Sequence, residues 1–209
     1  MLTDFSIGSA VVGGIVGAVC MVISANKIEA VKYNRKNKSY LSNLYLELQD
    51  ISEECSNELD CLYDIYAKAI HQDSSDTPGL IKKIDLPEYL LNLTLKEFIK
   101  TNLFILKINQ RKSLKKIISL IDKSNIYSSR LMNDCKEGNI SQIIYNSRYL
   151  IVLHAVIYQL SLNMAIQKDR YIIPSKSTNQ LLRTTLEIKR MDLSTAACIR
   201  YVNYLGTIN

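Results

Sequence analysis

The chain has 209 residues, of which 47% are hydrophobic and 22% are charged, a balance typical of a packed globular protein and not of a disordered tail. Its net charge of +6 favours anionic partners such as a membrane leaflet, nucleotides or nucleic acid. We find no glycine-rich phosphate loop, no nucleophile elbow and no Cys-x-x-Cys or His-Glu-x-x-His motif. With only two histidines in the chain, we expect no enzyme, no catalytic residue, no metal site and no cofactor.

Residues 5–25 form a stretch of 21 residues without a charged side chain. As a helix, this length covers a hydrocarbon core of roughly 30 Å. A signal peptide would begin with positive charge, but residues 1–4 carry only an acid. A buried core helix is the remaining alternative. We expect a membrane-spanning helix at 1–26, followed by a basic juxtamembrane collar at 27–38 and a helical cytosolic domain at 39–209. Positive charge near a span stays inside, which predicts a single-pass inner-membrane protein with its N-terminus outside.

Small residues follow one side of this stretch at a spacing of four, in the rows Ser9–Gly13–Gly17 and Ala10–Gly14–Ala18. Such rows let membrane helices approach closely, and two rows predict a neighbour on each side, as in a closed ring. A mildly polar strip between the rows suits a pore. A simple dimer and a chance glycine pattern remain alternatives. The candidate residues for pore and oligomer contacts are Ser6, Ser9, Ala10, Gly13, Gly14, Gly17, Met21 and Ser24.

The remaining chain predicts an all-α bundle. Apolar residues at three- and four-residue steps indicate a long helix over 39–71 with an acidic outer face, and a loop follows at 72–79. Asp85 and Pro87 suggest the cap and first turn of a helix over 88–108, although alternating leucines there also fit a strand. We expect further helices over 113–136 (ended by Gly138), over 140–168 as the apolar core, and over 178–205.

Cations gather at the entrance of the 113–136 helix, where phosphate could meet several of them together. The candidate anion-binding residues are Arg111, Lys112, Lys115, Lys116, Arg148 and Arg183. Arg148 is included because tyrosines flank it, which could allow stacking on a base. A solvated face, a salt-bridged match to the acidic helix, or simple tyrosine packing would explain the same pattern. His154 is predicted to be a buried, hydrogen-bonded histidine rather than a proton-transfer group.

The N-terminal SIGSAVVGGIVGAV helix, the basic collar and a helical domain without enzyme motifs together resemble the small single-span membrane effectors of bacterial anti-phage systems, in particular the channel proteins of Hailong systems. This resemblance in layout covers the whole chain. It implies a homo-oligomeric ion channel held shut by a DNA oligomer that a partner nucleotidyltransferase makes, and opened when that ligand is lost. No site residue is carried over from it.

Two hypotheses result. In the first, the chain is an oligomeric pore-forming effector whose helical domain binds an anionic nucleotide or oligonucleotide. In the second, it is a single-span anchor or adaptor that tethers a helical protein-interaction domain and conducts no ions.

Overall fold

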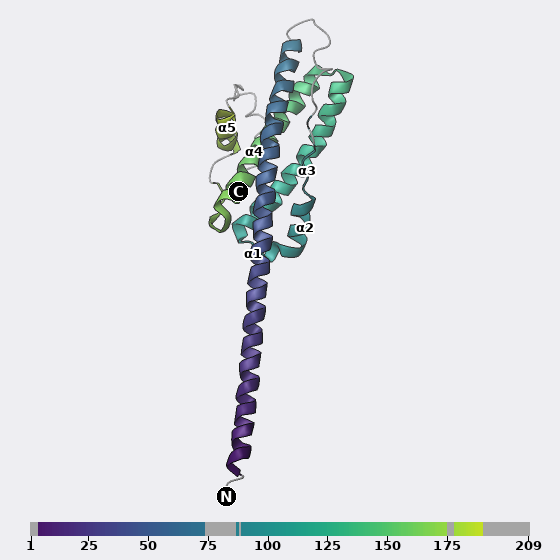
Figure 1. The fold of residues 1–209 in the computed structure, drawn as a ribbon. Coiled ribbons are helices and arrows are strands. Elements are labelled where there is room, and N and C mark those ends of the chain that lie inside the picture. The colour runs from purple at the N-terminus through teal and green to yellow at the C-terminus, as the bar shows by residue number, and fades with distance from the viewer. Residues whose placement is uncertain (1–3, 74–86, 88, 175–177, 190–209) are drawn as a thin grey trace. The chain divides into compact units, whose positions relative to one another are not determined.

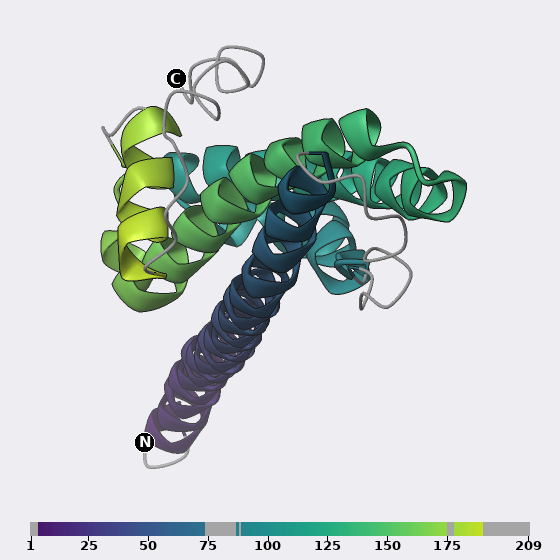
Figure 2. The same ribbon diagram turned by 90° about the horizontal axis from the view of Figure 1, so that it is seen from above.

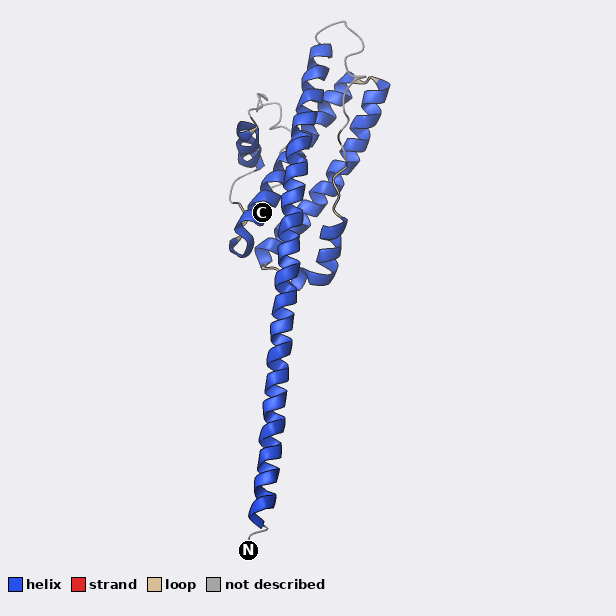
Figure 3. Ribbon diagram, viewed as in Figure 1, coloured by secondary structure: helices blue, strands red, loops and turns tan. Residues whose placement is uncertain are grey.

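The computed structural model describes residues 4–73, 87, 89–174 and 178–189, and of residues 4–19, 73, 178 and 179 only the backbone. Every regular element in this part of the chain is a helix (Figure 3), which confirms the all-α class. The chain divides into two compact units, Met1–Asn43 and Leu44–Asn209. The helix α1 (Asp4–Asp73) contributes to both.

In the first unit, α1 is helical over the uncharged stretch and over the basic residues 27–38 as well. No Gly or Pro interrupts the sequence from Ala18 to Asp73, so nothing local breaks the helix. Large apolar side chains such as Met21 (74% exposed) and Ile28 (55% exposed) lie open along it.

In the second unit, residues 44–73 of α1 carry the apolar stripe that the sequence predicts. The residues Leu44, Leu48, Ile51, Cys55, Leu59 and Leu62 are 0–2% exposed. They recur at three- and four-residue steps, so they line the one face of the helix that packs inward. The predicted helix over 39–71 is confirmed as part of α1.

The helix predicted over 88–108 is shorter than expected. α2 spans Leu93–Asn102 and is followed by a 3-10 turn, Leu103–Ile105. Pro87 is buried outside any helix, and Asp85 lies outside the described residues. The segment before α2 stays non-helical because the Asn125 side chain accepts from the Leu90 N–H (3.0 Å) and donates to its carbonyl (2.9 Å), which satisfies that backbone without a helix.

α3 (Ile108–Glu137) and α4 (Ile140–Gln167) form a helical hairpin, as Figure 1 shows. The Gln110 side chain accepts from the Lys107 N–H at 2.8 Å and caps the start of α3. Gly138 ends it with a left-handed φ of 72°, a conformation that glycine adopts without strain. The predicted stop at Gly138 is therefore confirmed, although α3 begins five residues earlier than 113.

α4 is the centre of the core, with 17 of its 28 residues buried. The stretch Ile140–Arg170 is long and apolar enough to cross a membrane, the one such stretch among the described residues. However, 78% of its most apolar window is buried inside the protein, as expected of the core helix that the sequence predicts. α5 (Thr178–Ile188) packs against α4 (Figure 2). Residues 190–205 of the predicted last helix lie outside the described part.

Candidate functional site

The candidate pore residues all belong to α1. The side chains of Ser6, Ser9, Ala10, Gly13, Gly14 and Gly17 lie outside the described part, whereas those of Met21 and Ser24 are exposed. Their predicted roles in oligomer and pore contacts stay predictions.

Four of the six candidate anion-binding residues come together on the first turns of α3. Lys112 and Lys115 are exposed and Lys116 is half-buried. Arg111 is already engaged, because its guanidinium donates to the carbonyls of Leu106 (2.7 Å) and Phe104 (3.4 Å). Arg111 therefore holds the turn before α3, and Lys112 and Lys115 are the cations best placed to meet an anion from solvent.

Arg148 does not belong to this cluster. Its Nε and Nη2 donate to the Tyr66 hydroxyl at 2.9 and 2.7 Å, and its guanidinium lies 4.9 Å from the centre of that ring. The α3 entrance is hydrogen-bonded to Lys168, just after α4 ends. Arg148 lies 19 residues before Gln167 on α4, which is about 28 Å along the helix. Arg148 thus ties α4 to residues 44–73 of α1.

Arg183 is also separate from the α3 entrance. It is exposed on α5, and α5 is joined to the middle of α4 by a hydrogen bond from Gln159 to Thr185 at 3.0 Å. The tyrosines around Arg148 have packing partners as well, since the rings of Tyr149 and Tyr127 stack with centroids 4.2 Å apart. Arg148 and Arg183 thus lie apart from the α3 entrance, and the anion-binding roles of all six residues stay predictions.

A buried polar node joins three segments beside the α3 entrance, and sequence reasoning missed it. Gln110 Nε2 donates to the Tyr45 hydroxyl and to the Lys168 carbonyl, both at 2.9 Å. The Tyr45 hydroxyl in turn donates to Asp169 Oδ1 at 3.3 Å. Burial, together with the negative charge of Asp169, raises the pKa of Tyr45 to about 12, so this hydroxyl keeps its proton. The node fixes the start of α3 against α1 within the second unit.

The acidic face of α1 is matched by basic residues only in part. Lys189, just after the end of α5, pairs with Asp60 at 2.7 Å, and Lys68 pairs with Asp64 one turn earlier on the same helix. The described part of the chain shows no ion pair between this face and Lys112 or Lys115. In the described part of the chain, the acidic face thus pairs with Lys189 and Lys68 and not with these two lysines.

A groove of about 540 Å³ lies between residues 49–56 of α1 and the C-terminal half of α4. Its lining mixes polar side chains with apolar ones: Gln49, Ser52, Glu53, Ser56, Tyr158, Leu162, Ala165, Ile166 and Lys168. Ile166 is 69% exposed, so the groove has an apolar rim.

His154 is fully buried in the middle of α4, as predicted. Its Nε2 is 2.7 Å from the Ser124 hydroxyl of α3, while Nδ1 has no partner among the described atoms. Burial lowers the pKa of His154 to about 4, so the ring is neutral near pH 7. No group of three His, Cys, Asp or Glu side chains in the described part could hold a metal ion.

Comparison with protein-family models, with curated proteins and with solved structures yielded no match, so the function of this chain has to be inferred from its own residues.

Proposed function

We propose that this chain is an oligomeric, pore-forming effector of the inner membrane, gated by an anionic nucleotide or oligonucleotide that binds its helical cytosolic unit. Residues 5–25 cross the bilayer once, with the N-terminus outside, and associate through their small-residue rows. On this proposal the protein acts in defence against phage, and a partner nucleotidyltransferase supplies the ligand. No step of chemistry is assigned to the chain itself.

The observation that carries the proposal is the composition of α1. One helix, Asp4–Asp73, contains 21 successive uncharged residues and, further along, the apolar stripe that packs into the helical unit. The uncharged part has the length of a membrane span and small residues at the spacing that favours close helix contacts. The helical unit supplies exposed cations, Lys112 and Lys115, that suit an anionic ligand.

A substitution in one small-residue row tests the pore. Gly13→Leu places a large side chain where we expect two helices to touch, so it should abolish both the oligomer and membrane depolarisation. Val12→Leu is the matched control, because it changes a large side chain on the expected lipid face. Membrane potential is read with a voltage-sensitive dye in cells expressing each chain. Depolarisation that is equal in the intact chain and in Gly13→Leu would contradict the proposed pore.

The second candidate function is a membrane-anchored adaptor, which the groove between α1 and α4 favours. On this hypothesis, a partner segment packs on the exposed apolar rim at Ile166 of the groove of about 540 Å³. On that hypothesis Gly13→Leu leaves tethering intact and the intact chain produces no depolarisation. Depolarisation by the intact chain that Gly13→Leu abolishes would therefore exclude the adaptor.

A further inference from the structure

Four charged side chains near the polar node have no partner in the described part of the chain. Glu47 and Asp50 lie on α1, and Lys112 and Lys115 lie on α3. None of them takes part in a hydrogen bond or ion pair there, although Glu47 is half-buried and the other three are exposed. These unpaired charges of both signs, two on each helix, are accessible to a partner outside the subunit.

The polar node fixes the relative heights of these charges. Tyr45 on α1 and Gln110 on α3 are joined by a buried hydrogen bond of 2.9 Å. From this bond both helices run in the same direction. α4 runs antiparallel to α3. Lys168, just after the end of α4, contacts Gln110, whereas Arg148, nearer the start of α4, contacts Tyr66, which lies further along α1 than Tyr45. The start of α3 and the part of α1 that follows Tyr45 therefore run parallel to each other.

Counting from the node gives equal heights for the opposite charges. Glu47 and Lys112 each lie two residues beyond the bonded pair, about 3 Å along the helix, and Asp50 and Lys115 each lie five residues beyond it, about 7.5 Å. The acidic pair on α1 and the basic pair on α3 thus have the same spacing and the same offset from the hydrogen-bonded pair.

We propose that these two pairs form a contact between copies of the chain, in which Glu47 and Asp50 of one copy meet Lys112 and Lys115 of the next. This inference rests on the proposed oligomer. A rotation axis parallel to the helices preserves height, so charges at equal height within one copy also meet at equal height between copies. Opposite charges at this contact set its register and orientation, whereas like charges that face each other there oppose the association that the membrane helices supply.

The contact also links the ligand to the assembly. A polyanion that binds Lys112 and Lys115 competes with the carboxylates of the neighbouring copy for the same ammonium groups. Ligand binding and the contact between helical units are then mutually exclusive at these residues, and each weakens the other by the same factor. This gives the anionic ligand a way to change the arrangement of subunits without acting at a distance.

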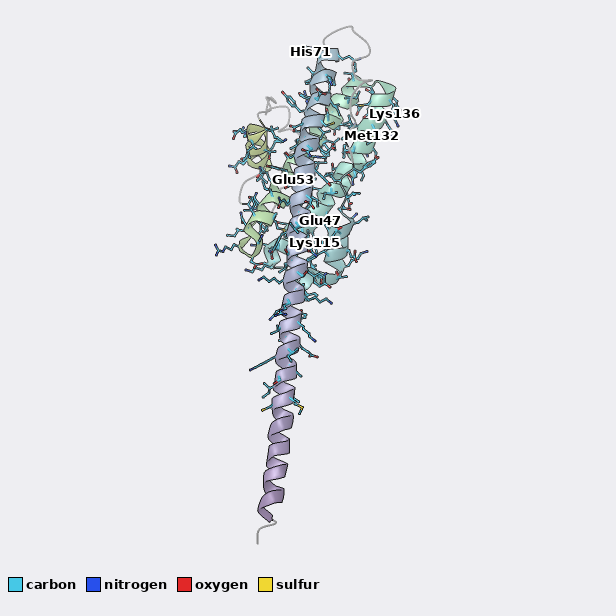
Figure 4. All side chains as sticks on the ribbon, in the orientation of Figure 1. Glu47, Glu53, His71, Lys115, Met132 and Lys136 are labelled. Atoms are coloured by element: carbon cyan, nitrogen blue, oxygen red, sulfur yellow. The ribbon has the colours of Figure 1, made fainter. Side chains whose placement is uncertain are left out.

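Charge reversal combined with zero-length crosslinking tests the contact in the full-length protein in detergent. A carbodiimide joins a carboxylate to a lysine that touches it, and mixing isotopically light and heavy chains identifies links between copies. We expect mixed-isotope links between the peptides of Glu47 or Asp50 and those of Lys112 or Lys115. Total oligomer yield should fall at least tenfold at low salt when either charge pair is reversed, by Glu47→Lys with Asp50→Lys or by Lys112→Glu with Lys115→Glu. The four substitutions together should restore it. Lys136→Glu, at the far end of α3 (Figure 4), is the control and should have no effect.

The outcomes separate this contact from the proposed pore. Links found only within single copies, or oligomer yield unchanged by either charge-reversed pair, would overturn the contact while leaving an oligomer held by the membrane helices. An intact chain that is monomeric in detergent and in cells would instead overturn the oligomer on which the contact rests. Melting temperatures within a few degrees of the unchanged chain exclude misfolding of the charge variants, because the reversed side chains do not belong to the core.

Discussion

The buried histidine of α4 predicts how the stability of the helical unit depends on pH. His154 has a pKa of about 4 in the folded protein and about 6.5 in an unfolded chain. The unfolded state therefore binds the proton at the higher pH, so stability falls as the pH drops from about 6.5 to about 4 and levels off below that. The full loss is about 3 kcal/mol, and between pH 7 and pH 4.5 it is about 2 to 3 kcal/mol.

The assay compares thermal unfolding, followed by circular dichroism, of the full-length protein in detergent at pH 7 and pH 4.5. A loss of 2 to 3 kcal/mol corresponds to a lower melting temperature by about 5 to 10 °C in a unit of this size. His154→Gln keeps a polar group toward Ser124 but cannot titrate, so its melting temperature should lack that part of the pH dependence. His71→Gln, which changes an exposed histidine, is the matched control. Equal pH dependence in the original protein and in His154→Gln would refute the reasoning.

Two further predictions concern the anion-binding lysines and the core. The double substitution Lys112→Gln and Lys115→Gln should make the binding of single-stranded DNA less dependent on salt, lowering the slope of log K against log salt by about 1.4. The control Lys136→Gln should leave the slope unchanged. Equal slopes for the double variant and the original protein, measured by fluorescence anisotropy, would exclude these lysines from the site. Leu150→Ala, at a fully buried position, should lower the free energy of unfolding by about 3 kcal/mol. Leu46→Ala, at a position 57% exposed, should change it by less than about 0.5 kcal/mol. Similar denaturation midpoints for the two variants would contradict the packing of Leu150 in the core.

The regular parts of this fold were predictable because their signals are local. The stripe from Leu44 to Leu62 follows the helical period, so periodicity alone identified both the helix and its buried face. Gly138 predicted the end of α3 because helices commonly end with a residue in the left-handed conformation, which is usually glycine. The apolar run of α4 pointed to the core, and its polar interruptions distinguished it from a membrane span.

The contacts that decide the site were not predictable, because they join residues far apart in the sequence. Asn125 bonds the Leu90 backbone across 35 residues, and this pairing moves the start of α2 to Leu93. Arg148 reaches Tyr66 across 82 residues, and this contact places it away from Lys112 and Lys115. Positive charge can be counted in a sequence, but the helix face and the height at which each cation lies depend on tertiary packing.

The hairpin turn at Gly138 has a consequence for biosynthesis. α3 and α4 are adjacent in the sequence and can pair as soon as both leave the ribosome, since local contacts form quickly. The apolar stripe of α1 is made much earlier, and Arg148 follows its partner Tyr66 by 82 residues, which is about 4 to 16 s of translation. During that interval the stripe has no core to pack against. A slow codon cluster between residues 73 and 140 would therefore lengthen the period in which the nascent chain is prone to aggregation.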